Sequence, residues 1–356
     1  MVQRSRMMAR SALVGAAVLA LAACGSVGNS SSSVSAASSG GGAKPAGGKF
    51  KIVTVSKLEG IPWFERMRVG VDDFGKANAS TVEARQTGPS KGDSALQIQV
   101  VQDLLAQNVD ALVVVPNDPQ AMAPVLKQAR DKGVVVVTHE APALAGTDSV
   151  NYDVEAFDNA KFGQAMFEQL AAGMGGKGEY AVMVAGLTNE THMAWYKAGV
   201  DYLKSKYPDM KAVTDKPYED NNDDATARAK ALEILAAHPN LKGFAGMSVS
   251  AGSNFAAVVK EKNLKGITVS TLSLPSIAGS YLKDGWMYNA QAWDPAAAAT
   301  AANALALQLL EKKTPATGVN LGGGGFESVT INGKLVTGNG ILKIAADDFS
   351  SGKYKY

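Results

Sequence analysis

The chain has a single cysteine, Cys24, and the residues before it indicate one chemical role for its thiol. A positively charged segment with Arg4, Arg6 and Arg10 precedes an apolar run over residues 11–20. This run is too short to span a bilayer as a permanent helix. This order is typical of an export signal. A lone exported cysteine cannot form a disulfide within its own chain, so its thiol suits a thioether-linked lipid.

The residues before Cys24, Leu21-Ala22-Ala23, resemble the lipobox of bacterial lipoproteins. The resemblance implies that residues 1–23 form a signal peptide and that Cys24 is lipid-modified as the first residue of the mature chain. Residues 24–48 are rich in Gly, Ser, Ala and Asn, a composition that predicts a flexible linker. We therefore expect an extracytoplasmic protein that its lipid anchors to the cell membrane, at the periplasmic face or cell surface.

The length and the net charge of the chain further limit the possible folds and functions. The 356 residues carry 35 basic and 33 acidic side chains, and residues 1–23 hold three of the basic ones and no acid. The remainder therefore has 32 basic and 33 acidic side chains, which argues against a nucleic-acid partner because phosphate binding needs a concentrated basic face. A body of about 310 residues exceeds what one core usually supports, so two lobes are expected.

From Phe50 onward, short β-branched runs alternate with segments of helical period, which predicts repeated βα units and parallel sheets covered on both faces. The predicted strands are 50–55, 81–84, 111–115, 134–138, 180–184, 212–214, 243–245, 267–272 and 287–292. The predicted helices are 63–78, 94–107, 119–132, 158–174, 193–207, 225–237 and 295–310. Two similar α/β lobes in series, followed by elements that the lobes exchange, predict a hinged pair with a cleft between them.

The order of these elements and four segments resemble the type I periplasmic solute-binding proteins for simple sugars: Lys51–Lys57, Pro62–Phe64, Val134–Glu140 and Trp293–Asp294. Within that class the chain is most similar to the branch that contains autoinducer-2 and rhamnose binding proteins. The resemblance covers residues 49–356 and implies an α/β fold of two Rossmann-like lobes with parallel sheets, joined by a three-strand hinge. We expect the N-terminal lobe to comprise residues 49–152 and 293–330, and the C-terminal lobe residues 153–292 and 331–356.

The resemblance assigns a binding role to five residues of the first lobe. A sugar presents hydroxyls around its rim and C–H groups on its faces, so its site needs donors, acceptors and aromatic rings. Trp63 and Phe64 occupy positions where sugar-binding relatives place stacking aromatics. Lys57 matches a ligand-contacting lysine of autoinducer-2 binders, and its charge needs a partner if it is buried. Glu140 stands where relatives carry an aspartate, and His139, in place of a tryptophan, is expected to form a pocket wall.

The resemblance also places candidate ligand contacts after strands of the second lobe and at the lobe crossing: Asn189, Thr191, His192, Ser250, Ser273, Gln291, Trp293 and Asp294. Thr191 and His192 stand where autoinducer-2 binders have Asp and Gln, which weakens the case for that ligand. Asn189 and the serines precede or begin helices, so each either contacts ligand or caps a helix. Trp195 is expected in the core.

The resemblance implies an extracytoplasmic solute-binding lipoprotein of an ABC importer. It would capture a small sugar, a polyol or a furanosyl signal molecule and deliver it, as a monomer, to a membrane permease with its ATPase. We expect no cofactor and no metal. An enzyme is the first alternative, but the chain has no Gly-x-Ser-x-Gly elbow, phosphate loop or metal-ligand spacing among its three histidines. Autoinducer-2-type signal binding or a role as a sensory receptor partner stays open, because sensing also uses lobe closure.

Overall fold

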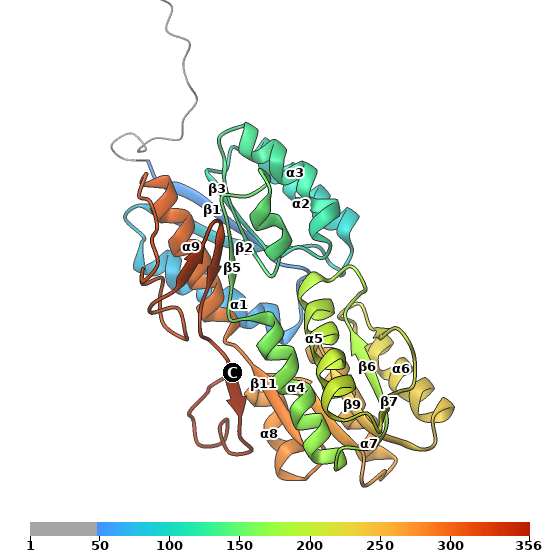
Figure 1. The fold of residues 1–356 in the computed structure, drawn as a ribbon. Coiled ribbons are helices and arrows are strands. Elements are labelled where there is room, and N and C mark those ends of the chain that lie inside the picture. The colour runs from blue at the N-terminus through green and yellow to red at the C-terminus, as the bar shows by residue number, and fades with distance from the viewer. Residues whose placement is uncertain (1–47) are drawn as a thin grey trace, which may run out of the picture. The chain divides into compact units, whose positions relative to one another are not determined.

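The computed structural model describes residues 48–356. The predicted signal peptide, Cys24 and the linker up to residue 47 lie outside the described residues. Within the described part, the strands form two seven-stranded sheets with helices on both faces of each, as Figure 1 shows. This arrangement confirms the predicted α/β class and its two lobes.

The first sheet has the strand order β12-β13-β5-β4-β3-β1-β2, and each neighbouring pair is parallel except β12 and β13. Its strands are β1 (Phe50–Val55), β2 (Val82–Thr87), β3 (Ala111–Val114), β4 (Val135–His139), β5 (Tyr152–Glu155), β12 (Thr330–Asn332) and β13 (Leu335–Thr337). The strand β3, inside the sheet between β4 and β1, is buried along its whole length. A strand covered on both faces has no solvent side, which is why it is apolar throughout.

The second sheet has the strand order β14-β11-β10-β9-β6-β7, with β8 paired to the far part of β6. Its strands are β6 (Gly178–Val184), β7 (Met210–Ala212), β8 (Tyr218–Glu219), β9 (Leu241–Gly246), β10 (Thr268–Leu272), β11 (Asn289–Ala292) and β14 (Leu342–Ile344). All pairs are parallel except β11 and β14. The carboxyl ends of the parallel strands therefore meet at one edge of each sheet, where open α/β folds bind ligands.

The described residues include nine α-helices and one 3-10 helix: α1 (Pro62–Ala77), α2 (Ser94–Ala106), α3 (Pro119–Asp131), η1 (Pro142–Gly146), α4 (Asn159–Met174), α5 (Glu190–Lys206), α6 (Asp224–Ala237), α7 (Val249–Glu261), α8 (Pro275–Lys283) and α9 (Pro295–Leu310). Seven of the α-helices follow a side chain that accepts a first-turn N–H: Asp93, Asp118, Asp158, Asn189, Asp223, Ser248 and Asp294. The other two, α1 and α8, begin at a proline, which has no N–H and so removes one of the unpaired donors of the first turn.

Helices α1 and α9 cover one face of the first sheet, and α2 and α3 cover the other. Alternate side chains of β1 reach the two layers, because Ile52 joins the core cluster under α1 and α9 while Val53 joins the cluster under α2 and α3. In the second sheet, α4 packs on β9 and β10 from one side and α7 packs on them from the other. No helix among residues 48–356 combines the length and apolarity that a membrane crossing requires.

Two glycines allow close contact between helices. A Cβ atom on Gly70 of α1 would overlap the backbone of Ala296 in α9, and one on Gly163 of α4 would overlap the backbone of Trp195 in α5. Close approach of these helix pairs therefore depends on the absence of a side chain.

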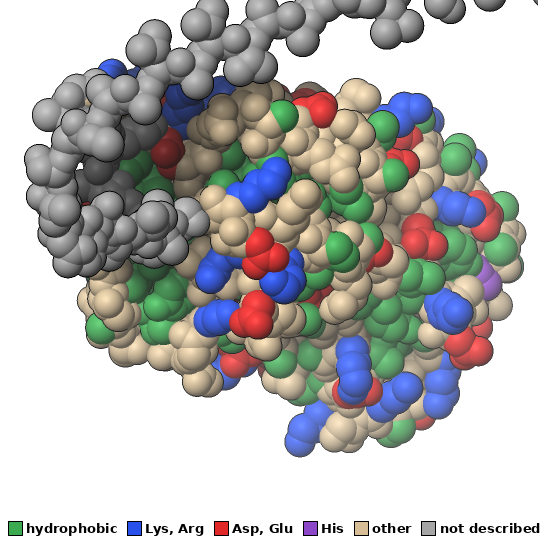
Figure 2. Space-filling view, turned by 90° about the horizontal axis from the view of Figure 1, so that it is seen from above, with side chains coloured by type: hydrophobic (Ala, Val, Ile, Leu, Met, Phe, Trp, Pro, Cys, Tyr) green, Lys and Arg blue, Asp and Glu red, His purple; other side chains and the backbone are tan. Residues whose placement is uncertain are grey.

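The surface is mixed in charge: on the face in Figure 2, Lys and Arg side chains are interspersed with Asp and Glu side chains.

The chain crosses between the two sheets three times, at residues 156–158, 293–294 and 338–341. We use "first lobe" for the first sheet with α1–α3, η1 and α9, and "second lobe" for the second sheet with α4–α8. Sheet membership differs from the predicted boundaries, because residues 153–155 and 331–337 belong to the first sheet. The cause is that β5 pairs with β4 before the chain crosses, and β13 then pairs with β5.

Candidate functional site

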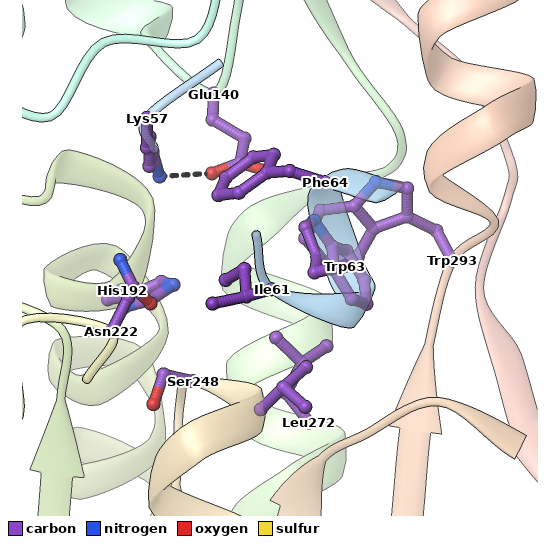
Figure 3. A pocket seen from close by; sticks show the side chains of 11 residues that line it. Lys57, Ile61, Trp63, Phe64, Glu140, His192, Asn222, Ser248, Leu272 and Trp293 are labelled. Carbon is purple, nitrogen blue, oxygen red and sulfur yellow. Dashed lines mark hydrogen bonds and ion pairs between the residues drawn. The ribbon is translucent and has the colours of Figure 1, made fainter. Parts of the chain in front are cut away.

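A pocket lies where the two lobes meet, at the ends of strands from both sheets, as Figure 3 shows. It is lined from the first lobe by Lys57, Ile61, Trp63, Phe64 and Glu140, from the second by His192, Asn222, Ser248, Val249 and Leu272, and at a crossing by Trp293. Its volume is about 20 Å³, which is room for roughly one water molecule. A larger ligand can enter only if the lobes separate or the lining side chains move.

Lys57 and Glu140 form an ion pair inside this pocket. Lys57 follows β1 and Glu140 follows β4, the two strands on either side of β3. The Lys57 Nζ atom lies 2.5 Å from the Glu140 Oε2 atom, and the two residues are only 2 % and 5 % exposed. Each buried charge needs the other, because its desolvation would otherwise be uncompensated. The pair therefore places a matched cation and anion, both able to hydrogen-bond, in a small and largely dry space.

The turn that carries Glu140 is strained and supported. Glu140 has φ +63°, a left-handed conformation that is uncommon for residues with a side chain. Asp153 Oδ1 accepts hydrogen bonds from the Thr138 hydroxyl at 2.7 Å and from the Ala141 N–H at 3.1 Å, on both sides of Glu140. Burial raises the pKa of Asp153, which lies on the neighbouring strand β5. Strain that a buried network holds in place is characteristic of functional positions.

Indole rings form the wall opposite His192. Trp63, in the first turn of α1, packs edge-on against Trp293 with ring centroids 4.6 Å apart and an interplanar angle of 77°. Trp293 also contacts Phe157 edge-on at 5.3 Å. The Trp293 Nε1 atom is buried without a hydrogen-bond partner among the described residues. Because buried indole N–H groups normally have a partner, this donor is available to a molecule in the pocket.

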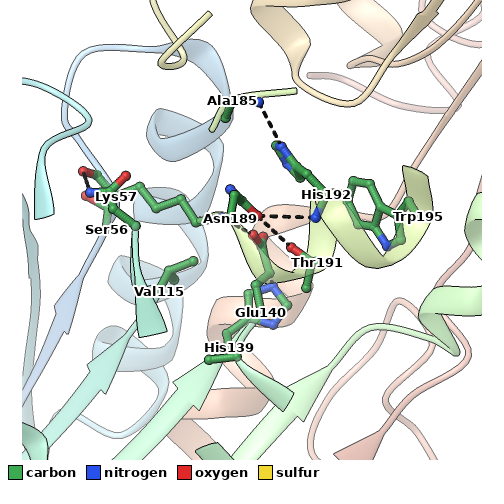
Figure 4. A network of polar contacts seen from close by, with 12 residues as sticks. Ser56, Lys57, Val115, His139, Glu140, Ala185, Asn189, Thr191, His192 and Trp195 are labelled. Carbon is green, nitrogen blue, oxygen red and sulfur yellow. Dashed lines mark hydrogen bonds and ion pairs between the residues drawn. The ribbon is translucent and has the colours of Figure 1, made fainter. Parts of the chain in front are cut away.

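His192 presents a neutral imidazole to the pocket from the first turn of α5. Its Nδ1 accepts the Ala185 N–H at 3.2 Å, and the backbone N–H of His192 donates to Asn189 Oδ1 at 3.2 Å, as Figure 4 shows. A ring whose Nδ1 accepts carries its hydrogen on Nε2, so the free side of the ring is a donor. Burial, with a further contribution from the charge of Lys57, holds the pKa of His192 well below its usual value.

His139 lies behind the pocket and does not line it. Its Nδ1 lies 2.5 Å from the Val154 carbonyl oxygen, so Nδ1 carries the hydrogen and donates it. Its Nε2 is 3.7 Å from Glu140 Oε1 and has no hydrogen-bond partner among the described residues. The ring also packs edge-on against Trp293 at 6.0 Å. His139 therefore backs two lining residues, Glu140 and Trp293.

A buried carboxylate supports the polar part of the second lobe's half. Asp220 Oδ1 accepts the Asn222 N–H at 2.8 Å, and Asp220 Oδ2 accepts the Ser248 hydroxyl. Ser248 in turn accepts the Ala251 N–H at 2.9 Å and so caps α7. Burial raises the pKa of Asp220 to about 7, although its hydrogen bonds with Ser248 and Asn222 oppose the rise.

Six of the predicted site residues lie in the pocket and seven lie outside it. Those that the structure brings together are Lys57, Trp63, Phe64, Glu140, His192 and Trp293. Those outside the lining are His139, Asn189, Thr191, Ser250, Ser273, Gln291 and Asp294. Asn189 caps α5 and accepts the Thr191 hydroxyl at 3.1 Å, which is the capping alternative left open by the sequence. Trp195 is 1 % exposed and belongs to the core, as predicted.

The remaining outlying residues have structural contacts. Gln291 donates to the Phe162 carbonyl at 3.0 Å, and the Ser273 hydroxyl contacts the Leu274 carbonyl at 3.4 Å. Ser250 is buried in the first turn of α7. Asp294 caps α9 and pairs with Arg66 through two hydrogen bonds of 2.9 and 2.7 Å, at one of the lobe crossings.

Five lining residues were not among the predicted set: Ile61, Asn222, Ser248, Val249 and Leu272. Ser248 lies two residues after the end of β9 and caps a helix, a position that the sequence marks as clearly as Ser250. The Asn221-Asn222 pair is a turn signal, and both residues have positive φ. Ile61, Val249 and Leu272 have no chemical signal of their own, since an apolar residue at a strand end is equally suited to the core.

The sequence places the chain in a known class. It belongs to the periplasmic binding protein domain family, whose model matches residues 52–314. Among curated proteins it is 26% identical over 262 residues to the xylitol-binding protein of Mycolicibacterium smegmatis, a match that spans 72% of this chain and 67% of that protein. It is 27% identical over 199 residues to the D-ribose/D-allose-binding protein of Pseudomonas aeruginosa, and this match spans 54% of this chain and 61% of that protein.

Solved structures share the fold. An ABC transporter solute-binding protein from Clostridium phytofermentas with bound L-rhamnose superposes with a TM-score of 0.78 at 20% identity, covering 87% of this chain and 99% of that one. LsrB from Clostridium saccharobutylicum in complex with AI-2 gives a TM-score of 0.76 at 19% identity, covering 86% of this chain and all of that one. At this level of identity the likeness establishes the type I periplasmic binding protein fold.

Proposed function

We propose that this chain is the solute-binding protein of an ABC importer and captures a small sugar or polyol between its lobes. The observation that carries the proposal is the buried Lys57–Glu140 pair beside the indoles of Trp63 and Trp293. The ion pair offers donors and an acceptor for hydroxyl groups, and the rings offer flat apolar faces for C–H groups. The names of the curated relatives, which bind xylitol and ribose or allose, support this ligand class.

Binding would couple to closure of the lobes. The lining comes from both lobes, so a ligand held by Lys57 and His192 together has contacts that exist only when the lobes are close. The interlobe hydrogen bond from the Ala143 N–H to Glu190 Oε1, at 2.8 Å, adds to the closed arrangement. A membrane permease with its ATPase would then recognise the closed form and accept the ligand.

The rest of the proposal follows from the family and the chain's N-terminal sequence. The protein acts by reversible capture without catalysis and works as a monomer outside the cytoplasm. Cys24 carries the lipid that holds it at the membrane, and the residues up to 48 serve as a tether. The proposed contacts are the six predicted residues that line the pocket, together with Asn222 and Ser248.

A signal molecule of the AI-2 type is the second candidate ligand, and a sensory partner role would accompany it. The likeness to LsrB in complex with AI-2 favours this candidate. Against it stands the side of the pocket where autoinducer-2 binders carry Asp and Gln. Here Thr191 is fully buried and bonded to Asn189, and the imidazole of His192 is neutral.

A thermal-shift screen of the purified chain tests the proposal. The probes are xylitol, D-ribose, D-xylose, L-rhamnose and AI-2 at millimolar concentration. A ligand present at about 1,000 times its Kd stabilises the folded protein by roughly 4 kcal/mol, which raises the unfolding midpoint by several degrees. We expect such a shift with at least one sugar or polyol.

The matched control is the double variant K57M/E140L, which replaces the ion pair by apolar side chains of similar size. It should keep a midpoint near that of the wild type, since a buried pair contributes little net stability compared with well-packed apolar groups. It should lose the ligand-induced shift. A folded wild-type chain that responds to none of the sugars and polyols, or a double variant that responds as the wild type does, would rule the proposal out.

A further inference from the structure

Asp220 is a buried carboxylate that the predicted binding contacts leave unused. It is fully buried and lies directly behind the second lobe's half of the pocket. Its two oxygens bond to two residues that line the pocket from separate segments: Asn222, in the turn before α6, and Ser248, at the start of α7. One side chain thus ties together two parts of the pocket wall that no sequence neighbourhood connects.

Both partners of Asp220 are donors. The backbone N–H of Asn222 can only donate, and the Ser248 hydroxyl donates its hydrogen to Asp220 while its oxygen accepts the Ala251 N–H. Two donors that face the two carboxylate oxygens suit the ionised acid, whose oxygens only accept. A protonated Asp220 would carry its own hydrogen and force Ser248 to turn its hydroxyl hydrogen elsewhere.

The turn at Asn222 needs this support. Asn221 and Asn222 both have positive φ, +55° and +54°, so two consecutive residues occupy the left-handed region. Such a turn persists only when its surroundings hold it. The N–H bond to Asp220 fixes the second of these residues, the one that lines the pocket.

We propose that Asp220 is a positioning residue for ligand binding, whose ionised form holds Asn222 and Ser248 in place and whose protonation weakens the capture of ligand. The inference rests on the proposed function and adds to it a pH-dependent control of affinity from outside the ligand contacts. The titration falls in a useful range, because burial raises the pKa of Asp220 to about 7. The charged and titratable groups around it are Glu219, Asp223, Asp224, His192 and the Lys57–Glu140 pair.

Two of these neighbours bear on the pH range in different ways. His192 is neutral near pH 7, because burial, with a further contribution from the charge of Lys57, holds its pKa well below the usual value. Asp224 adds to the raised pKa of Asp220 through its negative charge. Lys57 and Glu140 touch the ligand in the proposed site, so a test must separate Asp220 from them.

Calorimetric titration of the purified chain with xylitol, D-ribose and L-rhamnose between pH 6 and pH 8.5 makes this separation. The wild type should bind more weakly as the pH falls through 7, by up to about tenfold per pH unit for a single linked proton. D220N, which mimics the protonated acid, should bind about tenfold to a hundredfold more weakly at pH 8 and should lose this pH dependence. The exposed acid Asp209 gives a matched control, D209N, which should follow the wild type at every pH.

Two further variants distinguish positioning from general damage. In a Ser248→Ala background, Asp220→Asn should have a smaller effect than in the wild type, because one of the two groups it positions has gone. Without ligand, Asp220→Asn should stabilise the protein more at pH 8 than at pH 5. The folded-state pKa of Asp220, about 7, lies above its ordinary value of 3.8, so the ionised acid opposes folding in full only above pH 7.

The outcomes are distinct. A wild-type chain that binds none of the three probes would overturn the proposed function and this inference with it. Wild-type binding that keeps its affinity and pH profile in D220N would overturn the inference alone. An effect of D220N on affinity that is undiminished in the Ser248→Ala background and equal at all pH values would also overturn it, since general damage predicts that pattern.

Discussion

The two lobes build their halves of the pocket with different chemistry. The first lobe contributes a buried cation, a buried anion and two aromatic rings, with Lys57 and Glu140 paired inside that lobe alone. The second lobe contributes the neutral imidazole of His192, the hydroxyl of Ser248 and the turn residue Asn222, whose backbone N–H is bonded, and the partners of all three lie in the same lobe. Each half is therefore fixed before the lobes meet, the first by an ion pair and the second by hydrogen bonds to backbone groups and one carboxylate.

This difference predicts separate roles for the two lobes, one in the affinity for ligand and the other in how that affinity is controlled. Charge-assisted hydrogen bonds and ring faces are the stronger contacts, so the first lobe should set most of the affinity. The second lobe holds two buried titratable groups with shifted pKa values: burial raises the pKa of Asp220 to about 7, and burial holds the pKa of His192 well below its usual value, so its imidazole is neutral. The second lobe should therefore set how binding responds to pH and to closure. Three substitutions and one measurement on the unchanged protein test this division.

The largest effect is expected from Glu140→Ala. Removing the carboxylate leaves the Lys57 charge buried without a partner, which costs about 3–5 kcal/mol of stability. Urea unfolding at pH 7.5 measures this loss, and sugar or polyol binding should disappear with it. The control is K57M/E140L, which removes both charges. If Glu140→Ala were as stable as the double variant, the charge of Lys57 would not depend on Glu140 in the folded protein.

Trp63→Leu removes one ring of the wall and keeps an apolar side chain. The edge-on contact with Trp293 at 4.6 Å is lost, and aromatic pairs of this kind contribute about 0.5–1.5 kcal/mol beyond their buried area. With the ring face for the ligand also gone, calorimetry should record an affinity about tenfold to a hundredfold weaker. Trp286→Leu, in the second lobe and outside the pocket lining, is the control and should leave affinity unchanged. Equal affinity in both variants would remove Trp63 from the site.

Glu190→Gln tests the contact between the lobes with a smaller effect. Glu190 Oε1 accepts the Ala143 N–H across the lobes at 2.8 Å, and burial raises the pKa of this carboxyl. Replacing a charged acceptor by a neutral one should cost about 1 kcal/mol, seen as an affinity about fivefold weaker with faster ligand release. Stopped-flow measurement of ligand release compares it with Glu83→Gln, an exposed acid on β2. Identical release rates would show that the Ala143 contact does not contribute to closure.

The smallest expected effect concerns which ring nitrogen carries the hydrogen in two histidines, and it is measured on the unchanged protein. His139 Nδ1 faces a carbonyl oxygen and must carry hydrogen, whereas His192 Nδ1 accepts an N–H and must not. Nitrogen-15 NMR of the imidazole rings should therefore show opposite neutral tautomers for these two residues. His192 should stay neutral as the pH falls through 6.5, the ordinary pKa of a histidine, since burial and Lys57 hold its pKa low. Protonation of His192 near pH 6.5 would contradict the neutral second half of the pocket.

Much of the fold could be predicted from the spacing of apolar residues and from the residues that cap the helices. The prediction for strand 50–55 matches β1, and the helix predicted at 295–310 matches α9, because both have clear apolar periods and defined ends. The prediction for strand 212–214 was displaced, since β7 spans Met210–Ala212. The short strands β8, β12 and β13 were not predicted. They are held by pairing with β6 and β5, and such distant pairing leaves little trace in local sequence.

Site residues could be predicted from the sequence where the residue type is unusual for the segment in which the residue stands. A lysine and a glutamate at the ends of apolar strands, and adjacent aromatics after a proline, stand out in the sequence, and these residues meet in the pocket. Polar residues at helix starts gave an ambiguous signal, because a cap and a ligand contact need the same side chains. Asn189 and Asp294 are caps here, while Ser248 is both a cap and a lining residue. Only the packed structure separates these cases.

Isothermal titration calorimetry of the wild-type chain and K57M/E140L, side by side at pH 8 against xylitol, D-ribose and L-rhamnose, tests whether the ligand binds at the Lys57–Glu140 pair. We expect saturable binding of at least one of the three by the wild type and none by the folded double variant. Equal binding by both proteins would contradict the placement of the ligand at the Lys57–Glu140 pair.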